Sequence, residues 1–384
     1  MSNKKKIGIV TILRCNNYGA ELQAFALQKA MNLMGYDAEI LDYLFYKHKK
    51  HIKESCSKPF YNYPFKQAMK ERLFAWAEKI RVLPHLSVFH AREKGFNEFH
   101  QKNTKFSLKQ YTRMSELYQN PPLYDVYCVG SDQVWNPGCY TNINPYFLTF
   151  APKGKKRISY ASSFGITYVP EDAKEKYKDG LNGLDHISVR EETGVRLVKE
   201  LTGRDAKVVV DPTILLRKEN WEDVKDMKKV PEEPYILLYI LTEAPSLIET
   251  AQKLAREKNL PIYRICKWAM PEDKKESGII DIIDADPADF LGLFSGASII
   301  ITNAFHGTIF SIIFEKDFYC IMKKGKGDNN RMEHLCSTLG IAERVQFEGE
   351  FMEQDPIVYN EVSDKLEYYR KDSENYIRMA VDGK

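Results

Sequence analysis

The sequence lacks the patterns that mark a disulfide scaffold, a zinc site or a membrane span. It has seven cysteines, and no two of them form a Cys-x-x-Cys pair. Paired cysteines are typical of zinc sites and even sets of disulfide frameworks, so we expect reduced thiols in a cytoplasmic protein. No run approaches the roughly 20 apolar residues of a transmembrane helix. Residues 7–12 are too few for a signal-peptide core, so we expect a soluble or peripheral protein.

A dinucleotide-binding turn and a metal-ligand cluster are missing as well. The first predicted strand-turn-helix segment carries Asn16-Asn17-Tyr18-Gly19 where a dinucleotide fold would carry Gly-x-Gly-x-x-Gly. His48 and His51 have helical spacing, but no third metal ligand accompanies them. No nucleic-acid-binding motif is present. We therefore predict an activity without metal, dinucleotide cofactor or nucleic acid.

Positive charge is concentrated in one segment. The chain has a net charge of +3, but residues 47–109 contain 15 Lys or Arg and 5 Asp or Glu, which leaves the rest near −7. The segment also holds five of the eight histidines and many aromatic residues. Two interpretations remain open. The segment is an ordinary basic surface on a helical insertion, or it docks to an anionic membrane surface or a diphosphate-bearing substrate.

Alternating strand and helix patterns predict an α/β protein with parallel sheets. Segments with strand character follow one another along the whole chain, at 6–12, 37–43, 124–129, 157–161, 186–189, 207–210, 235–241, 261–265, 279–283, 298–302 and 318–321. Segments with helical spacing lie between and after them, at 21–34, 65–81, 88–101, 244–258, 286–294, 309–314, 331–339 and 359–380.

This order predicts two Rossmann-like domains facing a central cleft, with a helical insertion in the first domain. The first domain is expected over residues 1–230, with the basic helical insertion at about 45–120. Residues 231–234 contain two prolines and read as a linker, so the second domain is expected over 231–355. Residues 356–384 are expected to form a C-terminal helix that packs back on the first domain.

His306 is the most informative single residue. It follows a buried β-branched strand and a short turn, and it precedes an apolar helix. Ligands of open α/β sheets bind at the carboxyl ends of the strands, and helix N-termini attract anions. We therefore predict a catalytic role, the alternative being a histidine that only caps the helix. Other predicted strand ends carry polar residues too, which favours an enzyme: Asn17, Tyr18, Ser131, Asp132, Trp135, Ser162, Ser163, Arg190 and Asn303.

Two arginines are candidates for binding an anion. Arg190 follows a predicted strand, where its fork can hold a carboxylate or phosphate, unless it only pairs with Glu191 or Glu192. Arg331 follows a basic loop that suits a multiply charged anion or is simply solvated. Trp135 and Asp132 suit a sugar, by stacking and by hydrogen bonding, the alternative being a buried Trp135.

Several motifs, in this order, resemble the polysaccharide pyruvyl transferase family over nearly the whole chain. They are Asn17-Tyr18-Gly19-Ala20 with Leu22-Gln23-Ala24, Gly130-Ser131-Asp132-Gln133-Val134-Trp135-Asn136, Ser188-Val189-Arg190-Glu191, Asp211-Pro212-Thr213, and Thr302-Asn303-Ala304-Phe305-His306-Gly307. The resemblance implies a GT-B-like architecture and transfer of pyruvate from phosphoenolpyruvate to two sugar hydroxyls as a ketal. The family often has an arginine just before the strand-end histidine, whereas this chain has Ala304-Phe305 there, so Arg331 is the candidate for the missing cation.

These considerations assign residues to three roles. His306 and Arg190 are predicted to be catalytic, with His306 as the general acid. The donor site is predicted to contain Arg190, Arg331, Asn303, Thr308 and Ser162. The acceptor site is predicted to contain Asn17, Tyr18, Asp132 and Trp135.

The expected partners are phosphoenolpyruvate, as donor substrate and not cofactor, and a sugar acceptor that a polyprenyl diphosphate carries at the inner membrane face. Two other functions remain open. One is a GT-B glycosyltransferase that uses a nucleotide sugar and releases a nucleoside diphosphate. The other is a glycan-binding or scaffold protein without turnover.

Overall fold

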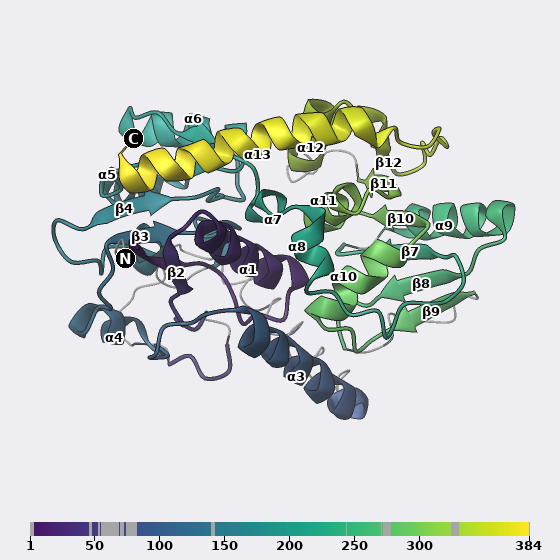
Figure 1. Ribbon diagram of the computed structural model, residues 1–384, viewed down its shortest axis with the longest axis horizontal. Helices are drawn as coiled ribbons and strands as arrows, with labels where there is room; N and C mark the ends of the chain where they lie inside the picture. The colour runs from purple at the N-terminus through teal and green to yellow at the C-terminus, as the bar shows by residue number, and fades with distance from the viewer. Residues whose placement is uncertain are drawn as a thin grey trace. The chain divides into compact units, whose positions relative to one another are not determined.

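The computed structural model describes residues 4–45, 48–52, 54, 69, 73, 83–139, 143–242, 244–269, 271, 278–323 and 330–383 (Figure 1). Apart from positions 69 and 73, the predicted helix at 65–81 lies outside these residues, as does most of the basic loop before Arg331.

The chain divides into two compact units. The first comprises Met1–Lys70, His100–Leu216 and Tyr368–Lys384, and the second comprises Glu71–Phe99 and Arg217–Glu367. The division falls after Leu216, earlier than the expected boundary at 230. Residues after it join the second unit because Trp221 packs edge-on against Phe310, at 5.0 Å between ring centroids, and the Asp226 amide donates to the Ala288 carbonyl.

A parallel sheet with strand order β2-β1-β3-β4 forms the centre of the first unit. Its strands are β1 (Lys6–Val10), β2 (Asp37–Ile40), β3 (Val126–Val129) and β4 (Lys156–Ser159). The parallel pair β5 (Ser188–Val189) and β6 (Lys207–Val208) continues it through isolated bridges such as Ile158 to His186. The chain runs from β1 to β2 and then returns to the other side of β1, so the topological switch point lies between the carboxyl ends of β1 and β3.

Helices cover this sheet. The first unit holds α1 (Tyr18–Leu33), α4 (Met114–Gln119), α5 (Lys174–Asn182), α6 (Glu192–Thr202) and α7 (Pro212–Leu215). One hydrophobic core joins Val129 of β3 to Tyr177 of α5 and Val198 of α6. The Tyr376 hydroxyl donates to the Ser159 carbonyl at 2.9 Å, so the end of α13 (Tyr359–Asp382) packs on β4. Helix α3 (Leu86–Asn103) contributes residues to both units, and its division falls between Phe99 and His100.

The second unit has a six-stranded parallel sheet in the order β12-β11-β10-β7-β8-β9. Its strands are β7 (Ile236–Tyr239), β8 (Ile262–Ile265), β9 (Ile279–Ile282), β10 (Ile299–Thr302), β11 (Asp317–Met322) and β12 (Val345–Phe347). Its helices are α8 (Lys218–Glu222), α9 (Pro245–Lys258), α10 (Pro287–Gly296), α11 (Phe305–Ile313) and α12 (Asn330–Leu339). The switch point of this sheet lies between β7 and β10.

Alternate strand residues bury opposite faces of this second sheet. Leu238 and Ile301 join the core that contains Leu254 of α9, whereas the Tyr239 ring lies 5.1 Å from Phe290 of α10. Helices on both faces of a parallel sheet are the doubly wound arrangement. The prediction of an α/β protein with two Rossmann-like units is therefore confirmed. Within the part of the chain that the structure describes, no helix is both long and apolar enough to span a membrane.

Candidate functional site

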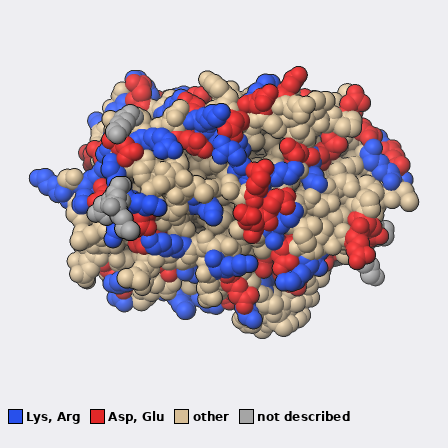
Figure 2. Space-filling view, viewed as in Figure 1, with Lys and Arg blue, Asp and Glu red and all other residues tan. Residues whose placement is uncertain are grey.

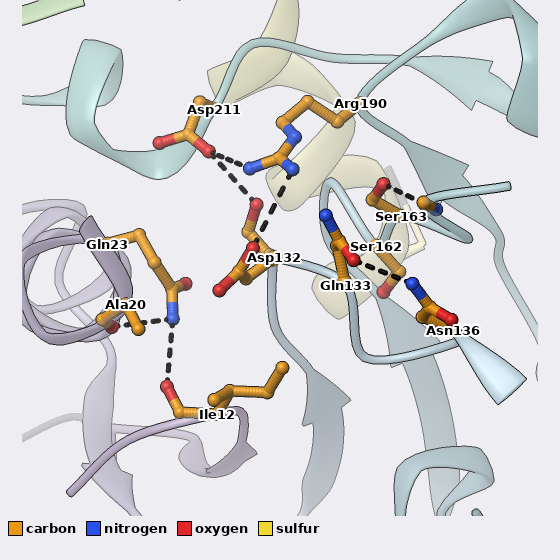
Figure 3. Close-up of polar contacts among 12 residues, drawn as sticks. Ile12, Ala20, Gln23, Asp132, Gln133, Asn136, Ser162, Ser163, Arg190 and Asp211 are labelled. Atoms are coloured by element: carbon orange, nitrogen blue, oxygen red, sulfur yellow. Dashed lines mark hydrogen bonds and ion pairs between the residues drawn. The ribbon is translucent and has the colours of Figure 1, made fainter. Parts of the chain in front are cut away.

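A hydrogen-bonded network lies at the carboxyl edge of the first sheet (Figure 3). Arg190 follows β5, and its Nη1 donates to Asp211 Oδ2 at 2.9 Å. The Ser131 hydroxyl, from the loop after β3, donates to the same oxygen at 3.1 Å. Arg190 Nη2 lies 3.8 Å from Asp132 Oδ1, and Nε lies 3.7 Å from Glu191 Oε2. The loops after β3, β5 and β6 are thus joined around one guanidinium.

Carboxylates outnumber cations at this edge. The Arg190 side chain is 2% exposed and that of Asp211 is fully buried, while the Asp132 side chain is 22% exposed. Burial lowers the pKa of Arg190, but the charges of Asp211, Glu191 and Asp132 raise it by more. The net shift is upward, so the guanidinium stays charged. Three carboxylates around one cation suit a ligand that donates hydrogen bonds, such as a sugar with its hydroxyls.

Backbone strain also gathers at this edge. Among the described residues, seven that are not glycine have a left-handed φ, and four of them lie in loops after β1, β3 and β4: Arg14, Asn16, Asp132 and Ala161. Such conformations cost about 1–3 kcal/mol each and persist only where the surroundings enforce them. Their clustering identifies these strand-end loops as the candidate site of the first unit.

The structure corrects part of the predicted acceptor site. Trp135 is fully buried, its indole N–H donates to the Tyr146 carbonyl at 3.0 Å, and its ring stacks on Phe147. The predicted stacking on a sugar is therefore wrong, because the ring is fully buried and its polar atom is hydrogen-bonded inside the core. Tyr18 is buried in the first turn of α1, whereas the exposed Asn17 caps that helix by accepting from the Ala20 amide.

Two residues predicted to bind the donor substrate form hydrogen bonds to the protein backbone instead. The Ser162 hydroxyl is fully buried and donates to the Gly130 carbonyl at 3.0 Å. The Thr308 hydroxyl is fully buried and donates to the Ala304 carbonyl at 3.2 Å within α11. Neither oxygen is exposed to a ligand, so these two assignments are corrected.

In the second unit, His306 and Arg331 both lie beside the Phe305 ring. His306 lies in the first turn of α11, directly after β10 and thus at the switch point of this sheet. The Arg331 guanidinium, from α12, lies 5.4 Å from the centroid of the Phe305 ring, and that ring lies 5.5 Å from the His306 ring. All three side chains are half-buried. An imidazole, a guanidinium and a helix N-terminus therefore share one edge, and this suits an anion.

Asn303 and Gly307 explain how the histidine is placed. Asn303 Oδ1 accepts from the Leu241 amide at 2.8 Å and Nδ2 donates to the Thr242 carbonyl at 2.8 Å, which ties the loops after β7 and β10 together. A Cβ at Gly307 would lie 2.4 Å from Thr302 Oγ1, so only glycine lets α11 approach the strand this closely. Asn303 therefore has a positioning role in this structure.

Sequence reasoning missed three functional candidates in the first unit. Asp211 fixes Arg190, and Glu21 and His100 form a buried pair with 2.7 Å between Oε2 and Nε2. Asp211 had a visible signal, because an Asp-Pro-Thr sequence after a strand is a helix-capping pattern, and its carboxylate does accept from the Thr213 amide. The contact between Glu21 and His100 could not be predicted, because the two residues are far apart in the sequence and no pattern links them.

Comparisons with known proteins place the chain in a family. It matches none of the curated proteins with which it was compared. Among solved structures it is similar to the UDP-GlcNAc 2-epimerase from Methanocaldococcus jannaschii, at 11% identity and a TM-score of 0.46, with 95% of this chain and 92% of that chain covered. It is also similar to the UDP-GlcNAc 2-epimerase from Neisseria meningitidis bound to UDP-GlcNAc (9%, TM-score 0.48, 98% and 97% covered) and to the ADP-heptose lipopolysaccharide heptosyltransferase II from E. coli (10%, TM-score 0.39, 96% and 99% covered). The family model described as polysaccharide pyruvyl transferase matches residues 17–322, which is most of the chain. The protein therefore belongs to the polysaccharide pyruvyl transferase family, a family of enzymes.

Proposed function

We propose that this protein transfers a pyruvyl group from phosphoenolpyruvate to two hydroxyls of a sugar in a cell-surface polysaccharide precursor. The product is a cyclic ketal and inorganic phosphate. The observation that carries the proposal, besides the family, is the group formed by His306, Phe305 and Arg331 at the switch point of the second sheet.

The donor's charges match this edge. Phosphoenolpyruvate has a phosphate and a carboxylate, and Arg331 with the N-terminus of α11 offers a cation and a partial positive charge. Lys323 directly follows β11, next to β10 in the sheet, and adds a second cation at the same edge. The resemblance assigns Arg190 to the donor too, and its orientation is already fixed by Asp211.

His306 is the proposed general acid. It would deliver a proton to the methylene carbon of the donor, which leaves an oxocarbenium-like centre at C2. One sugar hydroxyl attacks C2 and gives its proton back to His306. The second hydroxyl then displaces the phosphate and closes the ring, and the phosphate takes up the proton of that hydroxyl and leaves as inorganic phosphate. No step of this route needs a metal or a cofactor.

The acceptor is proposed to bind at the acidic edge of the first sheet. Asp132 accepts hydrogen bonds only, and its side chain is 22% exposed, so sugar hydroxyls can donate to it. Asn17 is exposed on the neighbouring loop. We propose a polyprenyl-diphosphate-linked sugar as the acceptor.

Mass spectrometry with phosphate analysis tests the proposal. Glycolipid precursors are incubated with phosphoenolpyruvate and protein, and the expected product gains the mass of one pyruvate minus water while phosphate is released. A parallel incubation with nucleotide sugars tests the glycosyltransferase alternative through release of a nucleoside diphosphate. Transfer of a sugar and no reaction with phosphoenolpyruvate would overturn the proposed function.

A further inference from the structure

Two side chains from the start of α1 hold the loop between β1 and α1. Glu21 Oε2 accepts from the Arg14 amide at 3.0 Å, and Oε1 accepts from the Cys15 amide at 2.8 Å. Gln23 Nε2 donates to Thr11 Oγ1 at 2.9 Å and to the Ile12 carbonyl at 3.3 Å. Figure 3 shows the Gln23 amide pointing to Ile12 and Ala20. The backbone of this loop is therefore tied to the helix that follows it.

His100 contacts the Glu21 carboxylate, which accepts the hydrogen bonds of the loop backbone. Its Nε2 lies 2.7 Å from Glu21 Oε2, and the two side chains are 3% and 1% exposed. Burial raises the pKa of Glu21, but the charge and hydrogen bond of His100, with the two backbone amides, bring it below its ordinary value. A buried carboxylate that lost this partner would be strongly destabilising. The Glu21 anion in this position thus depends on His100, which lies near the end of α3 and within the basic segment 47–109.

The loop is linked to the acidic edge of the sheet. Thr11 Oγ1, which accepts from Gln23, donates to the Ser131 carbonyl at 3.0 Å. The Ser131 hydroxyl donates to Asp211, which binds Arg190. Asp132 directly follows Ser131. The loop is therefore linked by hydrogen bonds to Ser131, the residue that precedes the partly exposed Asp132.

We propose that His100 and Glu21 are positioning residues for the acceptor: they fix the β1–α1 loop at the Arg14 and Cys15 amides, and this loop is linked to the backbone beside Asp132 through Thr11, which Gln23 and Ser131 hold. The inference rests on the proposed function in assigning the sugar to this edge. Arg14 and Asn16 both have left-handed φ angles, 57° and 54°; arginine rarely adopts this conformation, whereas asparagine tolerates it. Without the hydrogen bonds to Glu21 the disfavoured φ of Arg14 loses its support from the backbone amides, so we expect the loop to open more often although the Arg14 guanidinium stays paired with Asp42.

Hydrogen exchange tests the loop without any substrate. We compare the wild type with His100→Leu, which removes the hydrogen-bond donor, and His100→Gln, which keeps one. His90→Leu is the matched control, since His90 is on the same helix with a side chain that is 66% exposed. In His100→Leu the Arg14 and Cys15 amides should exchange at least about tenfold faster, the effect of losing one buried charge-assisted hydrogen bond. His100→Gln should stay within about threefold of wild type. If His100→Leu does not fold, Glu21→Gln takes its place. This variant keeps one accepting oxygen, so the Arg14 and Cys15 amides should exchange faster than in the wild type, by less than about tenfold.

Kinetics then test the assignment to the acceptor. We expect His100→Leu to raise the KM for the glycolipid acceptor at least about tenfold with the KM for phosphoenolpyruvate within about threefold, and His100→Gln to restore it. If His100→Leu folds and its Arg14 and Cys15 amides exchange at the wild-type rate, the proposal is overturned. It is also overturned if the KM values for both substrates change equally and His100→Gln does not restore them. If the wild type does not consume phosphoenolpyruvate, the proposed function fails, and the exchange rates alone decide whether His100 positions the loop.

Discussion

At the residue scale, His306 is the group on which the proposed chemistry depends most. Replacing it with Ala should lower kcat at least about 100-fold, the usual contribution of a general acid. The fold should be unchanged, because the imidazole is half-buried at a helix start and not in the core. Phosphate release from phosphoenolpyruvate is the measurement, with His334→Ala as control because His334 is exposed on α12. A soluble His306→Ala protein with near-normal turnover would contradict the assignment.

Arg190 and Arg331 are predicted to contribute differently to substrate binding and stability. Arg331→Ala should raise the KM for phosphoenolpyruvate about tenfold or more, because one charge-assisted contact to an anion contributes about 1.5–3 kcal/mol. Arg190→Lys should lower kcat/KM, since a fork becomes a point charge. Arg190→Ala should also lower the free energy of unfolding by about 3–5 kcal/mol, because buried Asp211 loses its cation.

Steady-state kinetics on both substrates and urea unfolding measure these effects. If the donor KM responds to Arg190→Lys, Arg190 binds the donor, and if only the acceptor KM responds, its role is to hold Asp132 and Asp211. No change of either KM in either arginine variant would place the donor site elsewhere.

Gly307 gives a prediction from packing alone. In Gly307→Ala the new methyl would lie 2.4 Å from Thr302 Oγ1 and 3.1 Å from Tyr239 Cδ1, so α11 must move away from the sheet. Overpacking of this kind costs about 1–3 kcal/mol of stability, and the movement would displace His306. We expect a lower melting temperature together with a lower kcat. Gly183→Ala is a suitable control because Gly183 is exposed, has a φ of −73°, and the atom nearest to an added Cβ lies 3.3 Å away; equal melting temperatures in the two variants would contradict the prediction.

At the element scale, local patterns predicted where strands and helices lie more reliably than what their side chains contact. The β-branched run at 299–302 and the apolar helix after it placed His306 at a strand end, and the structure has β10 and α11 there. Strand β12 escaped prediction because three residues carry too little periodicity. Trp135 was misassigned because its partners Phe147, Phe164 and Tyr146 come from later segments, and only the fold brings them together.

The contact of α1 with the end of α3 predicts a dependence of stability on pH. The folded-state pKa of Glu21 lies below its ordinary value of 4.5, so ionised Glu21 stabilises the fold above that pH, and this contribution is lost as pH falls through the folded-state pKa. Glu21→Gln should be less stable than wild type at pH 7, and the difference should shrink as the pH is lowered below 4.5. Urea unfolding across that range measures it. A difference that stays constant with pH would show that Glu21 is not ionised in the fold.

At the scale of the whole molecule, the concentration of positive charge in residues 47–109 has no role in the proposed reaction. Basic and acidic side chains are interspersed on the face shown in Figure 2. Along the chain, however, residues 47–109 carry +10. The two ends of this segment lie side by side, because the Ile52 amide donates to the Thr112 carbonyl just beyond it. Lys49 and Lys50 are exposed near the first end, and Leu108 and Lys109 are exposed near the second. Cations beside exposed apolar side chains are the pattern of a surface that meets an anionic membrane.

We therefore predict that the protein binds anionic vesicles and that this binding weakens with salt, because screening shortens the reach of exposed charges. Co-sedimentation with phosphatidylcholine vesicles, with and without phosphatidylserine, at low and high salt is the measurement. Reversing Lys49, Lys50 and Lys109 to Glu should abolish the binding. Reversing Lys174, Lys199 and Lys253, which are also exposed but lie elsewhere and pair with acidic side chains, makes the same change in net charge and should leave most of the binding. Equal loss in both triple variants would show that only net charge matters, and equal binding to neutral and anionic vesicles would make the basic segment an ordinary solvated surface.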